Sequence, residues 1–165
     1  MLIDELVPWL PKPQRRMIAI PWVVGQFVMT WAKHERALAN MLARIRQVDY
    51  EKFRDKLLDS QISAYEIEIK RTVNDVAIGH VARSYLETVL TEHVALRDLR
   101  HDVVHGFWAG IGPDDEYILK RKYRKGDDVA RTLELEEIWE GYQQLDRLGV
   151  VIINAYLAFE GKETI

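Results

Sequence analysis

Apolar residues spaced three and four apart recur through four long stretches of this chain, and they limit the folds that it can adopt. The stretches cover residues 22–46, 49–67, 78–105 and 134–159. Because this spacing places apolar side chains on one face of a helix, each stretch is predicted to be helical with that face in a core. The sequence therefore predicts an all-α bundle of four to five helices.

The first two helices have local start signals. Four prolines lie within residues 1–21, and they are expected to deny this segment a long helix and leave it as a packed, proline-rich arm. Asp49 is a suitable N-cap for the second helix. Whether that helix continues unbroken through Ser60 is left open by the sequence.

Two other helical stretches have unusual faces. His34 and Glu35 interrupt the apolar stripe of residues 22–46, so His34 is either a core histidine or part of a site, and Glu35 is a candidate supporting carboxylate. In the last stretch, apolar residues at 150, 151 and 153 widen the face beyond what one contact needs. That helix is expected to be central in the bundle or at a subunit interface.

Residues 107–133 lack the helical spacing. Residues 117–124 and 129–133 are strand-like and flank turn residues 125–128, which predicts a loop and then a β-hairpin inserted before the last helix. The hairpin concentrates cations around Tyr123, namely Lys120, Arg121, Lys122, Arg124, Lys125 and Arg131. These side chains could bind an RNA backbone while Tyr123 stacks on a base, or they could guard strand edges against pairing with other chains. Both interpretations stay open.

The densest group of reactive side chains lies in residues 97–108, RDLRHDVVHGFW. It falls on the last turns of the predicted third helix, with Gly106 as a C-cap. The negative end of the helix dipole favours a protonated imidazole at His105. Arg100 and His105 differ by about 140° around an ideal helix and about 7.5 Å along it. They converge more naturally if a second copy of the helix faces the first, so the spacing favours a dimeric site.

This stretch resembles the signature of HEPN domains, in which an Arg, a polar residue, three further residues and a His end the third helix of a small helical domain. Arg100, His101 and His105 match that pattern, followed by Gly106-Phe107-Trp108. The resemblance covers most of the chain in helix order and implies a single HEPN-like domain over residues 1–165. It also implies a homodimer whose Arg and His side chains line a cleft between protomers. Many members of the family are metal-independent ribonucleases of toxin, abortive-infection or CRISPR-associated systems, and some are non-catalytic.

Metal-free RNA cleavage needs a base, an acid and a cation on the phosphate. His105 is the best proton-transfer group and Arg100 the best phosphate clamp. His101 could orient the phosphate or act as a second acid or base, while Asp98 and Asp102 could set tautomers or form salt bridges. The expected products end in 2′,3′-cyclic phosphate, with no metal and no other cofactor.

Two other functions remain open. His101 and His105 are four apart with Asp98 on the same face, which is workable spacing for metal ligands in a hydrolase. The short Asp102 in His-Asp-Val-Val-His would be a poor general base there, and no third ligand follows. Alternatively, the Arg and His residues could satisfy each other in a non-catalytic dimerisation or sensor domain.

Composition excludes several classes of protein. The absence of cysteine excludes disulfides and thiolate chemistry. A net charge of −3 argues against coating nucleic acid through the overall field. The acidic N-terminus is unlike a signal peptide, and the longest apolar run, residues 149–159, is too short for a membrane span. We therefore expect a cytoplasmic protein with no membrane partner. The resemblance to HEPN domains implies that its partners are RNA, a second copy and an antitoxin or other inhibitory protein.

Overall fold

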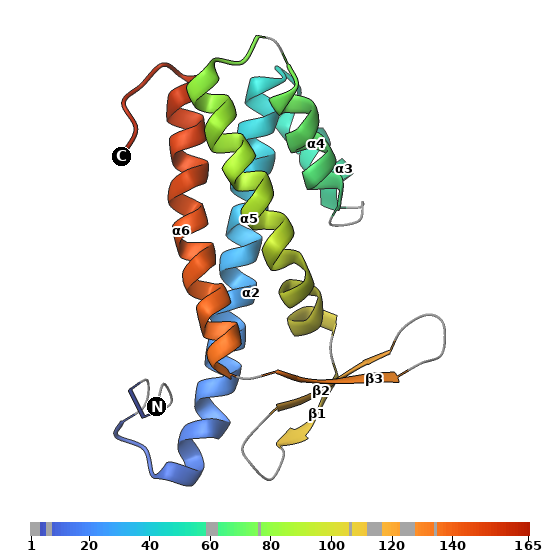
Figure 1. Ribbon diagram of the computed structural model, residues 1–165, viewed down its shortest axis with the longest axis vertical. Coiled ribbons are helices and arrows are strands. Elements are labelled where there is room, and N and C mark those ends of the chain that lie inside the picture. The colour runs from blue at the N-terminus through green and yellow to red at the C-terminus, as the bar shows by residue number, and fades with distance from the viewer. Residues whose placement is uncertain are drawn as a thin grey trace. The chain divides into compact units, whose positions relative to one another are not determined.

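The computed structural model is built mainly of long helices, with a small sheet before the last one (Figure 1). The structure describes residues 4–5, 8–58, 63–75, 77–105, 107–111, 117–122, 128–133 and 135–165. The helices are α2 (Lys12–Ile45), α3 (Tyr50–Leu58), α4 (Ser63–Val73), α5 (His80–His105) and α6 (Leu135–Phe159). The strands are β1 (Phe107–Ile111), β2 (Tyr117–Lys122) and β3 (Asp128–Leu133). The helical class predicted from the sequence is confirmed.

The N-terminal helix is longer than predicted, because α2 already begins at Lys12. The expected proline-rich arm over residues 1–21 is therefore wrong from residue 12 onward. Pro13 lies in the first turn, where no N–H is needed, and Pro21 is accommodated inside the helix at the loss of one backbone hydrogen bond. Arg15, near the start of α2, binds the segment that precedes the helix. Its side chain pairs with Asp4 and donates to the carbonyls of Pro8 at 2.8 Å and Leu10 at 2.5 Å.

The second predicted helix is divided into α3 and α4. The carboxylate of Asp49 accepts the backbone N–H of Lys52 at 2.9 Å, which confirms the predicted N-cap. Helix α3 ends at Leu58 and α4 begins at Ser63, with residues 59–62 outside the described part. Ile67, the last residue of the predicted apolar stretch, is 48% exposed, while the carboxylates on either side of it, Glu66 and Glu68, are buried.

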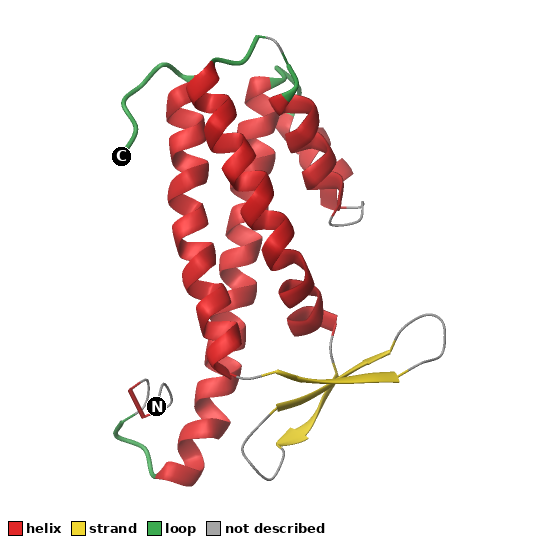
Figure 2. Ribbon diagram, in the orientation of Figure 1, coloured by secondary structure: helices red, strands yellow, loops and turns green. Residues whose placement is uncertain are grey.

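The inserted segment forms a three-stranded antiparallel sheet in the order β1-β2-β3 (Figure 2). Lys120 of β2 lies opposite Phe107 on one side and Ala130 on the other. The sequence predicted a loop and a two-stranded hairpin here. The loop is wrong for residues 107–111, which form a strand, and residues 112–116 lie outside the described part. The register of β1 against β2 shifts between Trp108 and Gly110, which marks an irregularity in this strand.

The chain divides into two compact units. Unit 1 contains residues 1–30 and 98–144, and unit 2 contains residues 31–97 and 145–165. In unit 1, buried apolar side chains include Val23, Phe27, Val103, Leu133, Leu135 and Ile138. In unit 2, they include Trp31, Leu38, Leu42, Ile69, Leu86, Val89, Leu145 and Ile152. In the described part of the chain, no helix has the length and apolar character needed to cross a membrane.

A glycine in α6 allows close packing in unit 1. A Cβ atom added to Gly141 would lie 2.3 Å from Cδ2 of Leu99 and 3.1 Å from Cε2 of Phe27. Because real carbon atoms do not approach this closely, a side chain at position 141 would displace one of these neighbours. The glycine thus lets α6 approach the part of α5 that immediately precedes Arg100.

Candidate active site

The residues predicted to be catalytic lie on the last turns of α5. Asp98, Arg100, His101 and Asp102 belong to unit 1, as does His105, the final residue of the helix. The side chain of His105 lies outside the described part, so only its backbone position is given. The predicted placement of the motif at the C-terminal end of a long helix is therefore correct.

Burial differs among the four described side chains. Asp102 is 2% exposed and lies beside the buried Val103, whereas Asp98 is exposed. Arg100 and His101 are half-buried, with Nε of Arg100 and Nδ1 of His101 shielded from solvent. Each of these two side chains thus has one nitrogen inside the protein, although the residue as a whole is partly exposed. This is the arrangement that positions a cation and an imidazole without removing them from solvent.

Arg97, at the start of the same dense stretch, has a structural partner in unit 2. Its Nη1 atom lies 3.2 Å and 3.3 Å from the two carboxylate oxygens of Glu66 on α4. Glu66 is 6% exposed, so this ion pair supplies the charge that a buried carboxylate requires. Of the two arginines in the stretch, Arg97 is bound to the scaffold and Arg100 lies nearer the end of the helix.

His93 extends this buried group in unit 2. It is 1% exposed, and its ring centroid lies 4.8 Å from that of Trp31 and 6.3 Å from that of Tyr65. Its Nδ1 atom is 4.0 Å from Glu66. His93 is therefore a core residue of unit 2 and not a surface histidine. Glu68, which is 3% exposed, is a second buried carboxylate. It forms ion pairs with Arg46 and, at 2.9 Å, with Arg71.

No helical pattern in the sequence identified these carboxylates. Glu66 and Glu68 alternate with apolar residues in Ser63–Val73, so a single apolar stripe does not separate the buried positions from the exposed ones. The only available signal was the supply of nearby cations, Arg46, Arg71 and Arg97, which can neutralise buried carboxylates. That signal becomes specific only when the helices are placed together.

His34 is packed in the core of unit 2. A Cβ atom added to Gly149 of α6 would lie 3.0 Å from its Nε2, so the ring occupies space that the glycine leaves. Burial lowers the pKa of His34, Lys33 lowers it further, and Asp146 opposes these effects. Nδ1 of His34 has no hydrogen-bond partner among the described residues. Of the two interpretations from the sequence, the structure favours a core histidine.

Glu35 is half-buried and belongs to unit 2, whereas the candidate catalytic residues belong to unit 1. Its charge acts on Tyr65: burial raises the pKa of the Tyr65 hydroxyl, and the charges of Glu35 and Tyr50 raise it further. The structure thus gives Glu35 an electrostatic role within unit 2.

The predicted RNA-binding residues are only partly described. Lys120, Arg121 and Lys122 lie consecutively on β2, the central strand of the sheet. Tyr123 and Arg124 lie outside the described residues, and of Lys120, Arg121 and Lys122 the backbone alone is given. The sheet follows α5 directly in the chain, so both sets of candidate residues belong to unit 1.

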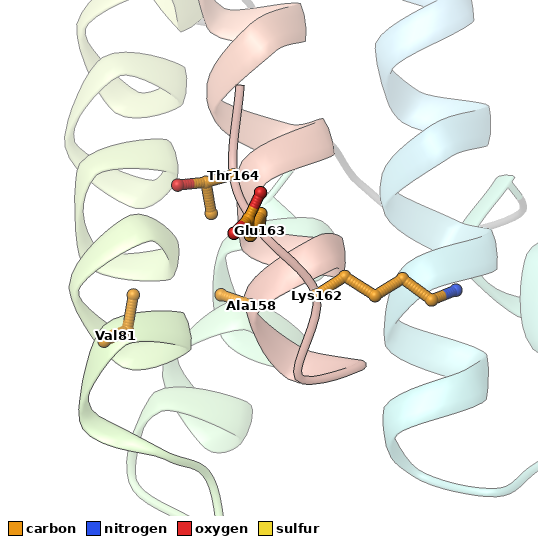
Figure 3. Close-up of a pocket in the computed structure, with 5 residues that line it drawn as sticks. All are labelled: Val81, Ala158, Lys162, Glu163 and Thr164. Atoms are coloured by element: carbon orange, nitrogen blue, oxygen red, sulfur yellow. The ribbon is translucent and has the colours of Figure 1, made fainter.

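Surface pockets lined by described residues occur in unit 2, among them two of different size. The larger, about 420 Å³, lies beside the segment that follows α6, and its lining residues are Val81, Ala158, Lys162, Glu163 and Thr164 (Figure 3). That segment turns back at Gly161, which has a φ of 68°, and is held by two 2.8 Å hydrogen bonds between the Asn154 amide and the backbone of Ile165. The other pocket, about 230 Å³, is lined by Ala37, Asn40, Met41, Arg44, Ile152, Ile153 and Tyr156. No candidate catalytic residue lines either pocket.

The described side chains include no group of three His, Cys, Asp or Glu that could hold a metal ion; His105 is not among these side chains. The motif supplies a fixed cation in Arg100, a proton-transfer group in His101 and a buried carboxylate in Asp102. Such a set can bind a phosphate and move protons. In comparisons with protein-family models, curated proteins and solved structures, the chain has no match.

Proposed function

We propose that this protein is a HEPN-type, metal-independent endoribonuclease of the toxin, abortive-infection or stress-response class. The observation that carries the proposal is the grouping of Asp98, Arg100, His101, Asp102 and His105 at the end of α5, in the unit that also contains the basic strand β2. A phosphate clamp, imidazoles and a cationic strand are the elements that RNA cleavage without metal requires.

The proposed reaction is attack of a ribose 2′-oxygen on the adjacent phosphorus. One imidazole removes the 2′-hydroxyl proton, the bond from phosphorus to the 5′-oxygen breaks, and a protonated imidazole gives its proton to that leaving oxygen. The products are a 2′,3′-cyclic phosphate and a 5′-hydroxyl. His105 is the principal proton-transfer residue and His101 is the second acid or base.

Arg100 has the role of stabilising the charge that develops on the phosphoryl oxygens. A guanidinium stays charged at all working pH values and can bind two phosphate oxygens at once. The partial burial of Arg100 supports this role because a cation shielded from water interacts more strongly with a phosphate. Asp102, buried three residues before His105 and hence near it on the helix, is proposed to orient the imidazole, and exposed Asp98 has a smaller supporting role.

The active form is proposed to be a homodimer with a composite site. Arg100 and His105 are separated by about 140° around one helix, so two helices together present an Arg and a His to one phosphate better than one helix does. Lys120, Arg121 and Lys122, with Tyr123 and Arg124, are proposed to hold the RNA strand. The protein is proposed to act in the cytoplasm and to be restrained by an antitoxin or another inhibitory partner.

The test is incubation of the purified protein with tRNA and mixed cellular RNA in EDTA, followed by analysis of the product ends. The wild type should leave cyclic phosphates, and Arg100→Ala and His105→Ala should each lose activity by at least about a hundredfold, the scale of a general acid–base contribution. His80→Ala is the matched control, because His80 is an exposed histidine on the same helix. It should retain wild-type activity.

A mixing experiment tests the composite site. If one phosphate meets an Arg from one protomer and a His from the other, then combining Arg100→Ala with His105→Ala should restore part of the activity that each variant lacks. Absence of restoration, with mixed dimers formed, would refute the composite site. Folded, dimeric wild type that cleaves no RNA would instead favour the dimerisation or sensor domain.

A further inference from the structure

An exposed apolar stripe runs along the N-terminal half of α2 in unit 1. Ile18, Trp22 and Met29 are 48%, 44% and 57% exposed. Their spacings of four and seven residues place them on one face of the helix. Gly25 lies between Trp22 and Met29, and no described side chain or neighbouring element comes within 4 Å of the position that its Cβ would occupy.

Two aromatic residues of α6 continue this stripe. The Trp22 and Trp139 rings are stacked, with centroids 5.9 Å apart and planes inclined by 29°. The Trp139 and Tyr142 rings follow at 5.0 Å. Trp139 and Tyr142 are half-buried, so the three rings form a partly exposed ladder across two helices. We refer to Ile18, Trp22, Met29, Trp139 and Tyr142 together as the aromatic face.

Carboxylates lie beside the aromatic residues of α6. Among the side chains of unit 1 that the structure describes, those that are both charged and exposed are all carboxylates: Asp4, Glu5, Asp98, Glu136 and Glu140. Glu136 and Glu140 lie three residues before and one after Trp139, so they flank it on α6. Arg15, the half-buried cation nearest the start of the stripe, is already paired with Asp4. The aromatic face thus has acidic neighbours on α6, and the side chains of Lys12, Arg16 and the basic strand β2 lie outside the described part.

We propose that the aromatic face binds a cationic amphipathic helix of a partner protein. The apolar side chains of such a helix would cover Ile18 and Met29, which are too exposed to stabilise this chain alone. Its Lys or Arg side chains would lie over the electron-rich faces of the tryptophans, near Glu136 and Glu140. The helix-in-groove mode of recognition uses this combination of apolar anchors and charged flanks.

The same charges disfavour two other occupants. An RNA backbone would bring phosphates toward Glu136 and Glu140, so the aromatic face is separate from the RNA-binding surface proposed above. In a symmetric dimer formed through this face, the carboxylates of the second copy would lie close to Glu136 and Glu140 and repel them. This inference does not depend on the ribonuclease proposal, because it requires no catalytic residue.

The test uses the intact protein and two synthetic helical peptides, one of leucine and lysine and one of leucine and glutamate with the same spacing. Binding is measured by calorimetry and by the change in tryptophan fluorescence. The lysine peptide should bind at least about tenfold more tightly than the glutamate peptide. Trp22→Gln should weaken binding of the lysine peptide by about tenfold or more, since this substitution removes the exposed ring.

The charge-reversed variant Glu136→Lys/Glu140→Lys provides a second measurement at exposed positions. It should weaken binding of the lysine peptide by a similar factor. Its matched control is Glu87→Lys/Glu163→Lys, which makes the same change of charge at exposed positions of unit 2 and should bind like wild type. Equal weakening in both double variants would refute the proposal, because the attraction would then be a general effect of net charge. Trp22-dependent binding of poly(U), or a dimer that Trp22→Gln dissociates, would also refute it.

Discussion

Gly141 of α6 gives a stability prediction whose sign depends on tertiary packing. In an isolated helix, Gly→Ala is favourable by about 1 kcal/mol, because alanine loses less backbone entropy. At position 141 the new Cβ would lie 2.3 Å from Cδ2 of Leu99 and 3.1 Å from Cε2 of Phe27. Phe27 is fully buried and cannot retreat without disturbing the core. Leu99 is half-buried and must change its rotamer or move with its helix.

The magnitude follows from two opposing terms. Overpacking of a core by one methyl group typically costs about 1–3 kcal/mol, against the helix gain of about 1 kcal/mol. Gly141→Ala is therefore expected to lower the free energy of unfolding by up to about 2 kcal/mol. Gly25→Ala is the matched control in α2, because no atom lies within 4 Å of its Cβ position. It should raise the free energy of unfolding by up to about 1 kcal/mol.

The assay is urea denaturation of both variants and the wild type, followed by circular dichroism at constant pH. The quantity of interest is the difference between the two variants, since it cancels the helix propensity term and leaves the packing cost. If Gly141→Ala proved as stable as Gly25→Ala, the contact among α2, α5 and α6 in unit 1 would be looser than described. Because Leu99 directly precedes Arg100, Gly141→Ala should also reduce any RNA cleavage by more than the unfolded fraction explains.

Burial lowers the pKa of His34, so the unfolded chain takes up this proton more readily than the folded protein. The contribution of neutral His34 to the free energy of unfolding should be complete above pH 6.5, the ordinary pKa value. It should decrease as the pH falls from there toward the lowered pKa. The measurement is urea denaturation at pH 7.5 and 5.5, in which His34→Gln should reduce the difference in stability between the two pH values and His80→Gln should not. An unchanged difference in His34→Gln would contradict the role given to His34. Tyr65→Phe should stabilise the protein by about 1 kcal/mol, because the buried hydroxyl has no hydrogen-bond partner among the described residues. A loss of thermal stability in Tyr65→Phe would mean that the hydroxyl is satisfied. Asp49→Ala should destabilise by about 1 kcal/mol through loss of the N-cap of α3. Asp49→Asn, which keeps a capping oxygen, should have a denaturation midpoint close to that of the wild type. An equal loss of stability in both variants would assign the effect to charge instead.

Local patterns in the sequence determined α5, α6 and the N-cap of α3. The three-and-four spacing placed α5 and α6 to within two residues of their observed starts, and the Asp49 cap needed only the three residues that follow it. The position of the candidate motif at the end of α5 was predictable for the same reason. Each of these features depends on neighbours within about one helical turn.

Long-range packing decided the features that the sequence left open or predicted wrongly. Pro21 lies inside a helix because the surrounding turns of α2 are held by tertiary contacts, which can outweigh the loss of one hydrogen bond. Glu66 is buried because Arg97, thirty-one residues away, neutralises it. His34 is buried because Gly149 leaves space for its ring. Such pairings join residues from separate elements, so no single stretch of sequence contains the information that determines them.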